Sequence, residues 1–137
     1  MPAELVVDAS VIAKCFFEED GTDKALDVLR SGVRLVAPEF LHAEFASIAA
    51  KKVRRGDIER ASAAGAVGNV GSLLAEVFSS EALSGRAFAL SVETGCSAYD
   101  GLYLSLAEAR GCRVVTADAR LVRNAENAHL SHLVQAL

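Results

Sequence analysis

The sequence predicts an α/β domain in which a central, mostly parallel sheet of four to five strands carries helices on both faces. Two patterns support this three-layer α/β/α fold. Short apolar runs alternate along the chain with longer helical stretches, as in β–α–β units. The strand candidates are mostly apolar at consecutive positions, which is typical of strands buried on both faces. A chain of 137 residues fits a single domain, residues 1–137.

Five segments are expected to form the sheet. Each is short and mostly apolar, and turn residues or helical stretches separate one from the next. The last segment is expected to supply only a short edge strand. The candidates are Leu5–Val7, Val33–Ala37, Leu73–Phe78, Arg113–Thr116 and a part of His129–Leu137.

Helices are expected between these strands. They are Ser10–Phe17, Thr22–Arg30, Pro38 to about Arg55, a segment that begins after Asp57, Ser80 to about Gly95, and Tyr99–Arg110. Asp8 or Ser10 can cap the first helix, and Asp57 is a plausible N-cap for the fourth. Pro38 is expected at a first helical position, where its missing N–H costs nothing.

Composition narrows the class of protein. A net charge of −4 disfavours a general nucleic-acid binder, although bound metal would neutralise some of the acids. The three cysteines are too scattered for a CxxC pair and predict reduced thiols in the cytoplasm. We expect no membrane span and no secretory signal, because the apolar runs are short and a basic leader is lacking.

Four carboxylates stand where the local structure is expected to change. Asp8 and Asp118 follow apolar strands, and ligands bind beyond the carboxyl ends of parallel strands. Glu44 and Asp100 are set in apolar helical stretches. Each has a structural alternative: Glu44 can reach water at the margin of its apolar stripe, and the three aspartates can cap or begin helices. Together they predict one acidic site for a hard divalent metal ion.

Two hydroxyl groups accompany these acids. Ser10 comes two residues after Asp8, and Thr116 comes two residues before Asp118. Each can orient a carboxylate or a water molecule, and capping explains Ser10 at least as well.

Other site types lack parts of their patterns. His42-Ala43-Glu44 has the HxE spacing of zinc deaminases but no PCxxC partner. A receiver-like module would also place acids after the first strand. It normally requires an acidic pair there and a late lysine, whereas no lysine follows Lys52.

Four stretches of the sequence together resemble the PIN-domain family, and more closely the VapC-type toxins of bacterial toxin–antitoxin pairs. They recur in the family's order and span nearly the whole chain. The stretches are Val6–Val11, Ala37–Glu44, Ser97–Ala107 and Thr116–Leu121. One departure is Ser47, because relatives often have asparagine three residues after the helix glutamate.

The resemblance implies a PIN-like fold and a Mg²⁺-dependent endoribonuclease, with Mn²⁺ as a second possible ion, that hydrolyses RNA of the tRNA or rRNA class. It also implies a homodimer and a small VapB-like antitoxin that blocks the acidic groove. The family's acidic quartet corresponds to Asp8, Glu44, Asp100 and Asp118, with Ser10 and Thr116 as supporting hydroxyls.

We expect Asp8, Asp100 and Asp118 to be direct metal ligands, and Glu44 to be a ligand or to orient water. The candidates for phosphate contact are Lys14, Lys51, Lys52, Arg54 and Arg55, although the basic cluster 51–55 equally suits a helix C-terminus. The alternative function is a catalytically silent PIN-like or receiver-like module that acts through protein binding.

Overall fold

The computed structural model describes residues 2–137 and contains one five-stranded sheet. The strands are β1 (Glu4–Val7), β2 (Arg34–Pro38), β3 (Glu76–Phe78), β4 (Val114–Thr116) and β5 (Val134–Ala136). Their order across the sheet is β3-β2-β1-β4-β5, and all four pairings are parallel. The expected sheet is therefore confirmed, and β5 is the short edge strand at the C-terminus.

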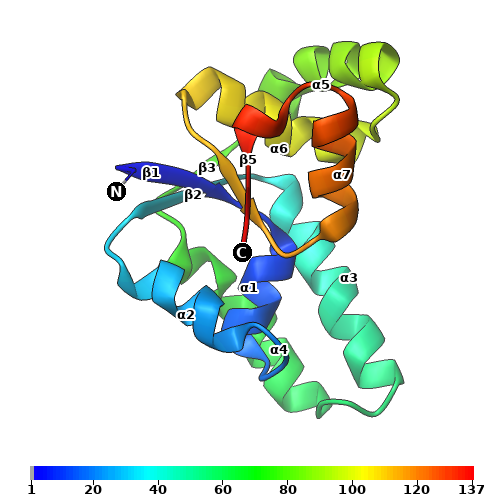
Figure 1. The fold of residues 1–137 in the computed structure, drawn as a ribbon. Helices are drawn as coiled ribbons and strands as arrows, with labels where there is room; N and C mark the ends of the chain where they lie inside the picture. Colours follow the sequence, from blue (N-terminus) through cyan, green and yellow to red (C-terminus); the bar gives the residue numbers. More distant parts are fainter. Residues whose placement is uncertain (1) are drawn as a thin grey trace.

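Helices cover both faces of the sheet and complete the three layers. They are α1 (Ala9–Phe16), α2 (Thr22–Arg30), α3 (Phe40–Arg54), α4 (Arg60–Asn69), α5 (Ser80–Thr94), α6 (Ala98–Arg110) and α7 (Ala119–Asn127). Figure 1 shows α1 to α4 gathered on one side of the strands and α5 to α7 on the other. The sequence-based prediction of an α/β/α architecture is confirmed.

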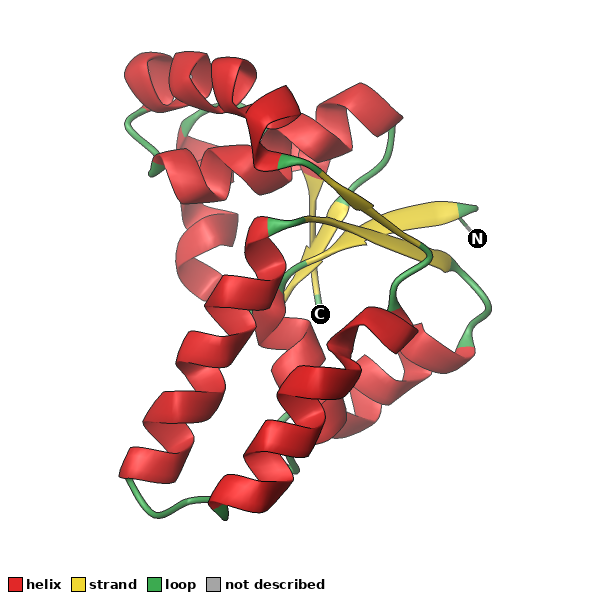
Figure 2. Ribbon diagram, turned by 180° about the vertical axis from the view of Figure 1, so that it is seen from behind, coloured by secondary structure: helices red, strands yellow, loops and turns green. Residues whose placement is uncertain are grey.

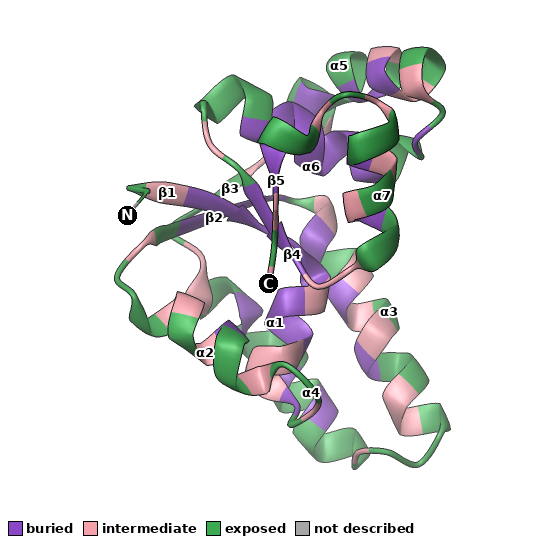
Figure 3. Ribbon diagram, viewed as in Figure 1, coloured by how far each residue is buried: buried purple, intermediate pink, exposed green. Residues whose placement is uncertain are grey.

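The central strands are buried because their side chains meet helices on both faces. Val6, Val36 and Val114 have no exposed surface, and Figure 3 shows buried residues running through β1, β2 and β4. Removing such apolar side chains from water stabilises the folded state by about 25 cal/mol for each Å² of apolar surface that is buried. A central β1, flanked by β2 and β4, places Asp8 in the middle of the sheet's carboxyl edge.

Pro38 does not begin a helix, so this expectation was wrong. It is the last residue of β2 and pairs with Phe78 of β3, and the backbone N–H of Glu39 donates to the Phe78 carbonyl over 2.7 Å. A proline at the end of a strand gives up no interior ladder hydrogen bond, so the strand tolerates it. Helix α3 consequently begins at Phe40, and Glu44 lies in its second turn.

Other elements also differ from expectation. The 3₁₀ turn η1 (Val70–Leu73) takes the start of the predicted third strand, so β3 has only three residues. Asp57 lies in the turn between α3 and α4, where its N–H donates to the Lys52 carbonyl, and Glu59 precedes α4 instead. Helix α7 had not been anticipated, because its sequence is mostly polar. A second 3₁₀ turn, η2 (Ser131–Leu133), leads into β5.

Helices α3 and α4 form a hairpin that extends well beyond the sheet, as Figure 2 shows from behind. The basic cluster 51–55 lies at the end of α3, close to the tip of this hairpin. Among residues 2–137, no helix combines the length and the apolar character needed to cross a membrane.

Candidate active site

The four carboxylates singled out from the sequence line a single cavity of about 660 Å³. Asp8 reaches it from the end of β1, Glu44 from α3, Asp100 from the first turn of α6 and Asp118 from the start of α7. Ser10 and Ser47 line the same cavity. Parallel strands that end at one edge, with helices beginning there, account for this convergence.

Asp8 is the most buried of the four and is held by a dense set of donors. Its Oδ1 accepts hydrogen bonds from the backbone N–H groups of Ser10 and Val11, over 3.1 and 3.3 Å, and from the Ser10 hydroxyl. Its Oδ2 accepts the hydroxyl of Thr116. Burial raises the pKa of Asp8, whereas these hydrogen bonds lower it and stabilise the charged form.

The two hydroxyl groups also connect the ends of β1 and β4. Thr116 Oγ1 accepts the backbone N–H of Asp118 over 2.9 Å while it donates to Asp8. Ser10 Oγ accepts the backbone N–H of Ala117 over 3.0 Å. Ser10 and Thr116 therefore position Asp8 relative to the segment that carries Asp118, and Asp8 itself is the N-cap of α1.

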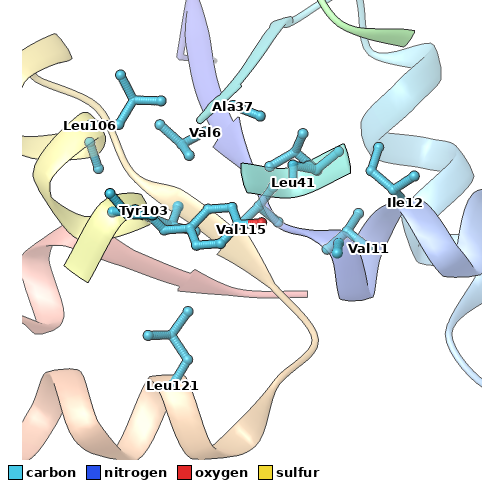
Figure 4. Packing of buried hydrophobic residues seen from close by; sticks show 14 of the residues in the cluster. Val6, Val11, Ile12, Ala37, Leu41, Tyr103, Leu106, Val115 and Leu121 are labelled. Carbon is cyan, nitrogen blue, oxygen red and sulfur yellow. The ribbon is translucent and has the colours of Figure 1, made fainter. Parts of the chain in front are cut away.

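Glu44 is half-buried and accepts a hydrogen bond from the hydroxyl of Tyr103, 2.8 Å from its Oε1. Figure 4 shows the Tyr103 ring within the cluster of buried core side chains. Burial raises the pKa of Glu44, the Tyr103 hydrogen bond lowers it, and the nearby charges of Asp8 and Asp100 raise it again. Burial and the Glu44 carboxylate likewise raise the pKa of Tyr103, which keeps the hydroxyl protonated as a donor.

Asp100 and Asp118 share one cation, the guanidinium of Arg120. Arg120 donates to both oxygens of Asp100, at 2.9 and 3.4 Å, and to Oδ2 of Asp118 at 3.1 Å. Asp100 is buried, whereas the Asp118 side chain is about one-third exposed, at 34 %. A forked guanidinium is well suited to such a pair of carboxylates. With Arg120 between Asp100 and Asp118, no three Asp, Glu, His or Cys side chains of residues 2–137 are gathered around one point as ligands of a metal ion.

The five basic candidates do not all face this site. Lys51 lines the acidic cavity and also an adjoining hollow of about 300 Å³, which Lys14, Lys52 and Arg55 line as well. Lys14 and Lys52 form ion pairs with Glu19, over 3.4 and 2.7 Å. Arg54 is exposed and lines neither hollow.

Sequence reasoning had not assigned roles to Arg120 and Tyr103. The sequence does contain a spacing that relates each of them to an acid of the site. Tyr103 follows Asp100 by three residues on one helix, so the two share a face. Arg120 follows Asp118 by two residues in the first turn of α7. What the sequence could not show is that α3 brings Glu44 to Tyr103, or that α6 brings Asp100 to Arg120.

Comparisons with known proteins show the fold and the family of the chain. A solved structure, PAE2754 from Pyrobaculum aerophilum, has the same fold, with a TM-score of 0.70 at 24% sequence identity over 89% of this chain and 79% of that one. Ribonuclease VapC3 from the same organism is 29% identical over 120 residues, which are 86% of this chain and 92% of the relative. The PIN-domain model matches residues 5–127. The chain therefore belongs to the PIN-domain family.

Proposed function

We propose that this protein is a metal-dependent endoribonuclease of the VapC kind, which hydrolyses phosphodiester bonds in RNA. The observation that carries the proposal is the convergence of Asp8, Glu44, Asp100 and Asp118 on one cavity, from four separate elements. Membership of the PIN-domain family and similarity to a protein named as a ribonuclease support the same activity.

The donor set suits Mg²⁺ or Mn²⁺. Both ions prefer carboxylate oxygens, and the four side chains supply no sulfur or imidazole. The negative charges of Asp8 and Asp100 act on Glu44, and that of Asp118 acts on Asp8, so a cation between them would relieve mutual repulsion. Arg120 shows that a positive group fits between Asp100 and Asp118.

We assign Asp8, Asp100 and Asp118 as metal ligands, and Glu44 as a ligand or as the group that orients water. A bound divalent ion supplies positive charge at the scissile phosphate and lowers the pKa of water. Ser10 and Thr116 fix the Asp8 carboxylate, and Tyr103 fixes Glu44. A carboxylate oxygen not engaged with the ion is available to accept the proton of the attacking water.

The remaining surroundings suggest how a substrate and partners approach. Lys51 and Arg55 are exposed cations beside the site and are suited to contact phosphates, whereas Lys14 and Lys52 are already paired with Glu19.

By its family relation the substrate belongs to the tRNA or rRNA class, and the protein acts in the cytoplasm as a homodimer. A small VapB-like antitoxin would inhibit it by placing an arginine among the carboxylates.

The test is RNA cleavage by the purified protein with Mg²⁺ or Mn²⁺ and with EDTA, with the products mapped by sequencing. Asp100→Asn should abolish cleavage, because it removes a charge from the cavity while leaving the fold intact. The matched control is Asp57→Asn, which changes an exposed aspartate in the α3–α4 turn and should leave cleavage unchanged.

Two results would count against the proposal. Cleavage that survives in Asp100→Asn would refute the assignment of this cavity as the active site. Absence of hydrolysis with every divalent ion, together with retained binding of a protein partner, would favour the catalytically silent module instead.

A further inference from the structure

An exposed aromatic pair borders the acidic cavity. Tyr99 immediately precedes Asp100 at the start of α6, and its exposed fraction is 61 %. Its ring stacks on that of Phe40, the first residue of α3, with centroids 4.9 Å apart and planes inclined by 20°. Both rings line the cavity that holds the four carboxylates.

The stacking leaves one face of the Tyr99 ring available. Phe40 covers the other face, yet most of the tyrosine remains in contact with water. The pair fixes the ring, so an occupant that stacks on it loses little side-chain freedom of the protein. A flat apolar surface beside a polar cavity is thus ready to receive a planar group.

The charges around the pair narrow the choice of occupant. The carboxylates repel a simple anion, whereas an uncharged planar ring is tolerated. Lys51 lines the same cavity and can neutralise a phosphate that is attached to such a ring. A nucleotide unit within an RNA chain combines these two parts. Phe88 and Val92 of α5 are also exposed, but they do not line this cavity.

We propose that Tyr99, supported by Phe40, is a stacking platform for one unpaired base next to the phosphate that is cut. This inference rests on the proposed ribonuclease function and assigns Tyr99 a contact with the substrate. A base within a duplex is covered by its neighbours on both faces, whereas a base in a loop or single strand can stack on an aromatic side chain.

Binding measurements test the platform without relying on cleavage. In the Asp100→Asn background with Mg²⁺, Tyr99→Ala should bind a single-stranded oligoribonucleotide about 5- to 150-fold more weakly. Tyr99→Phe should bind it normally, because the ring is kept. The matched control Phe88→Ala, which removes another exposed aromatic ring, should also bind normally. With a ribose-phosphate chain of equal length that lacks bases, Tyr99→Ala should bind as well as its parent.

A fluorescence experiment locates the contact. The chain has no tryptophan, so Tyr99→Trp introduces a single one at the platform. Its emission should change when the oligoribonucleotide is added and should not change with the base-free chain. A tryptophan at position 88, introduced by Phe88→Trp, should respond to neither.

The outcomes separate this inference from the function on which it rests. If the wild type cleaves RNA but Tyr99→Ala binds normally, or loses equal affinity for the base-free chain, the platform is refuted and the nuclease stands. If the wild type cleaves nothing but base-dependent binding needs Tyr99, base stacking on Tyr99 stands, whereas the nuclease and the place of the base beside a cut phosphate are refuted. Loss of self-association in Tyr99→Ala, with RNA affinity unchanged, would assign the ring to a protein interface and overturn the inference.

Discussion

Arg120 neutralises Asp100 from within the same chain: its Nη1 lies 2.9 Å from Oδ2 of Asp100, and its Nη2 also reaches Asp118. The guanidinium side chain is about half exposed, at 54 %, whereas that of Asp100 is almost fully buried, at 9 %. A cation of the protein therefore holds two of the carboxylates assigned to metal. Because Arg120 is exposed, it can leave at modest cost in free energy.

Replacing Arg120 by glutamine should strengthen metal binding. The variant removes a positive charge that competes for Asp100 and Asp118, so Mn²⁺ should bind about two- to tenfold more tightly. Isothermal titration calorimetry at fixed ionic strength measures this directly, without RNA. Arg123→Gln, an equal charge change one turn further along α7, is the control and should have little effect. Unchanged or weaker Mn²⁺ binding in Arg120→Gln would show that Arg120 does not compete with the ion.

The sequence predicted those parts of the site that depend on local pattern. Asp8 and Asp118 could be placed because an apolar strand ends beside each of them, and the order of strands and helices defines the edge where such residues meet. Arg120 and Tyr103 could not be assigned, because their pairings depend on how α6 packs against α7 and α3. The same limit applies to Pro38, whose place depends on its pairing with Phe78 of β3.

Tyr103→Phe tests whether the hydroxyl positions Glu44 for catalysis. The variant keeps the buried ring but removes the donor 2.8 Å from Glu44 Oε1. We expect the free energy of unfolding to fall by about 0.5–1.5 kcal/mol. The cleavage rate with Mg²⁺ should fall by about 10- to 100-fold, because a carboxylate without its partner is poorly oriented. Single-turnover kinetics and urea unfolding measure the two effects. A loss of stability without any change in rate would give the hydroxyl a purely structural role.

Glu4 should make the stability of the fold depend on pH. It accepts hydrogen bonds from Arg110, over 2.7 and 3.0 Å, and from Arg34, and it thereby connects β1 with α6 and β2. The Arg110 hydrogen bond, together with that of Arg34, lowers the pKa of Glu4 below its ordinary value of 4.5. A carboxylate with a lowered pKa stabilises the folded state above its unfolded pKa. That contribution is lost as the pH falls through the folded-state pKa.

Urea unfolding of the wild type and Glu4→Gln across pH 7 to 3 measures this contribution. At pH 7 the variant should be less stable than the wild type, and the difference should shrink below about pH 4.5 as the wild-type carboxylate takes up a proton. The control is Glu18→Gln, which changes an exposed glutamate. Its free energy of unfolding should equal that of the wild type at each pH. A difference that stays constant down to pH 3 would mean that the charge of Glu4 is not its source.

Gly101, beside Asp100, should be intolerant of a side chain. A Cβ at this position would lie 2.9 Å from the carbonyl oxygen and 3.0 Å from the Cα of Ala87 in α5. Both atoms belong to the backbone, so α5 and α6 would have to separate. We therefore expect Gly101→Ala to lower the free energy of unfolding by about 1–3 kcal/mol. It should also weaken Mn²⁺ binding, because Asp100 moves with α6.

Gly85→Ala is the matched control for this substitution. Gly85 lies in the exposed part of α5, and a Cβ there would meet no atom within 4 Å. Alanine should stabilise the helix by about 0.5–1 kcal/mol, since it restricts the unfolded chain more than glycine does. The midpoints of thermal and urea unfolding should therefore shift in opposite directions in the two variants, relative to the wild type. If Gly101→Ala proved as stable as Gly85→Ala, close contact between the α5 and α6 backbones would not be what requires glycine beside the acidic site.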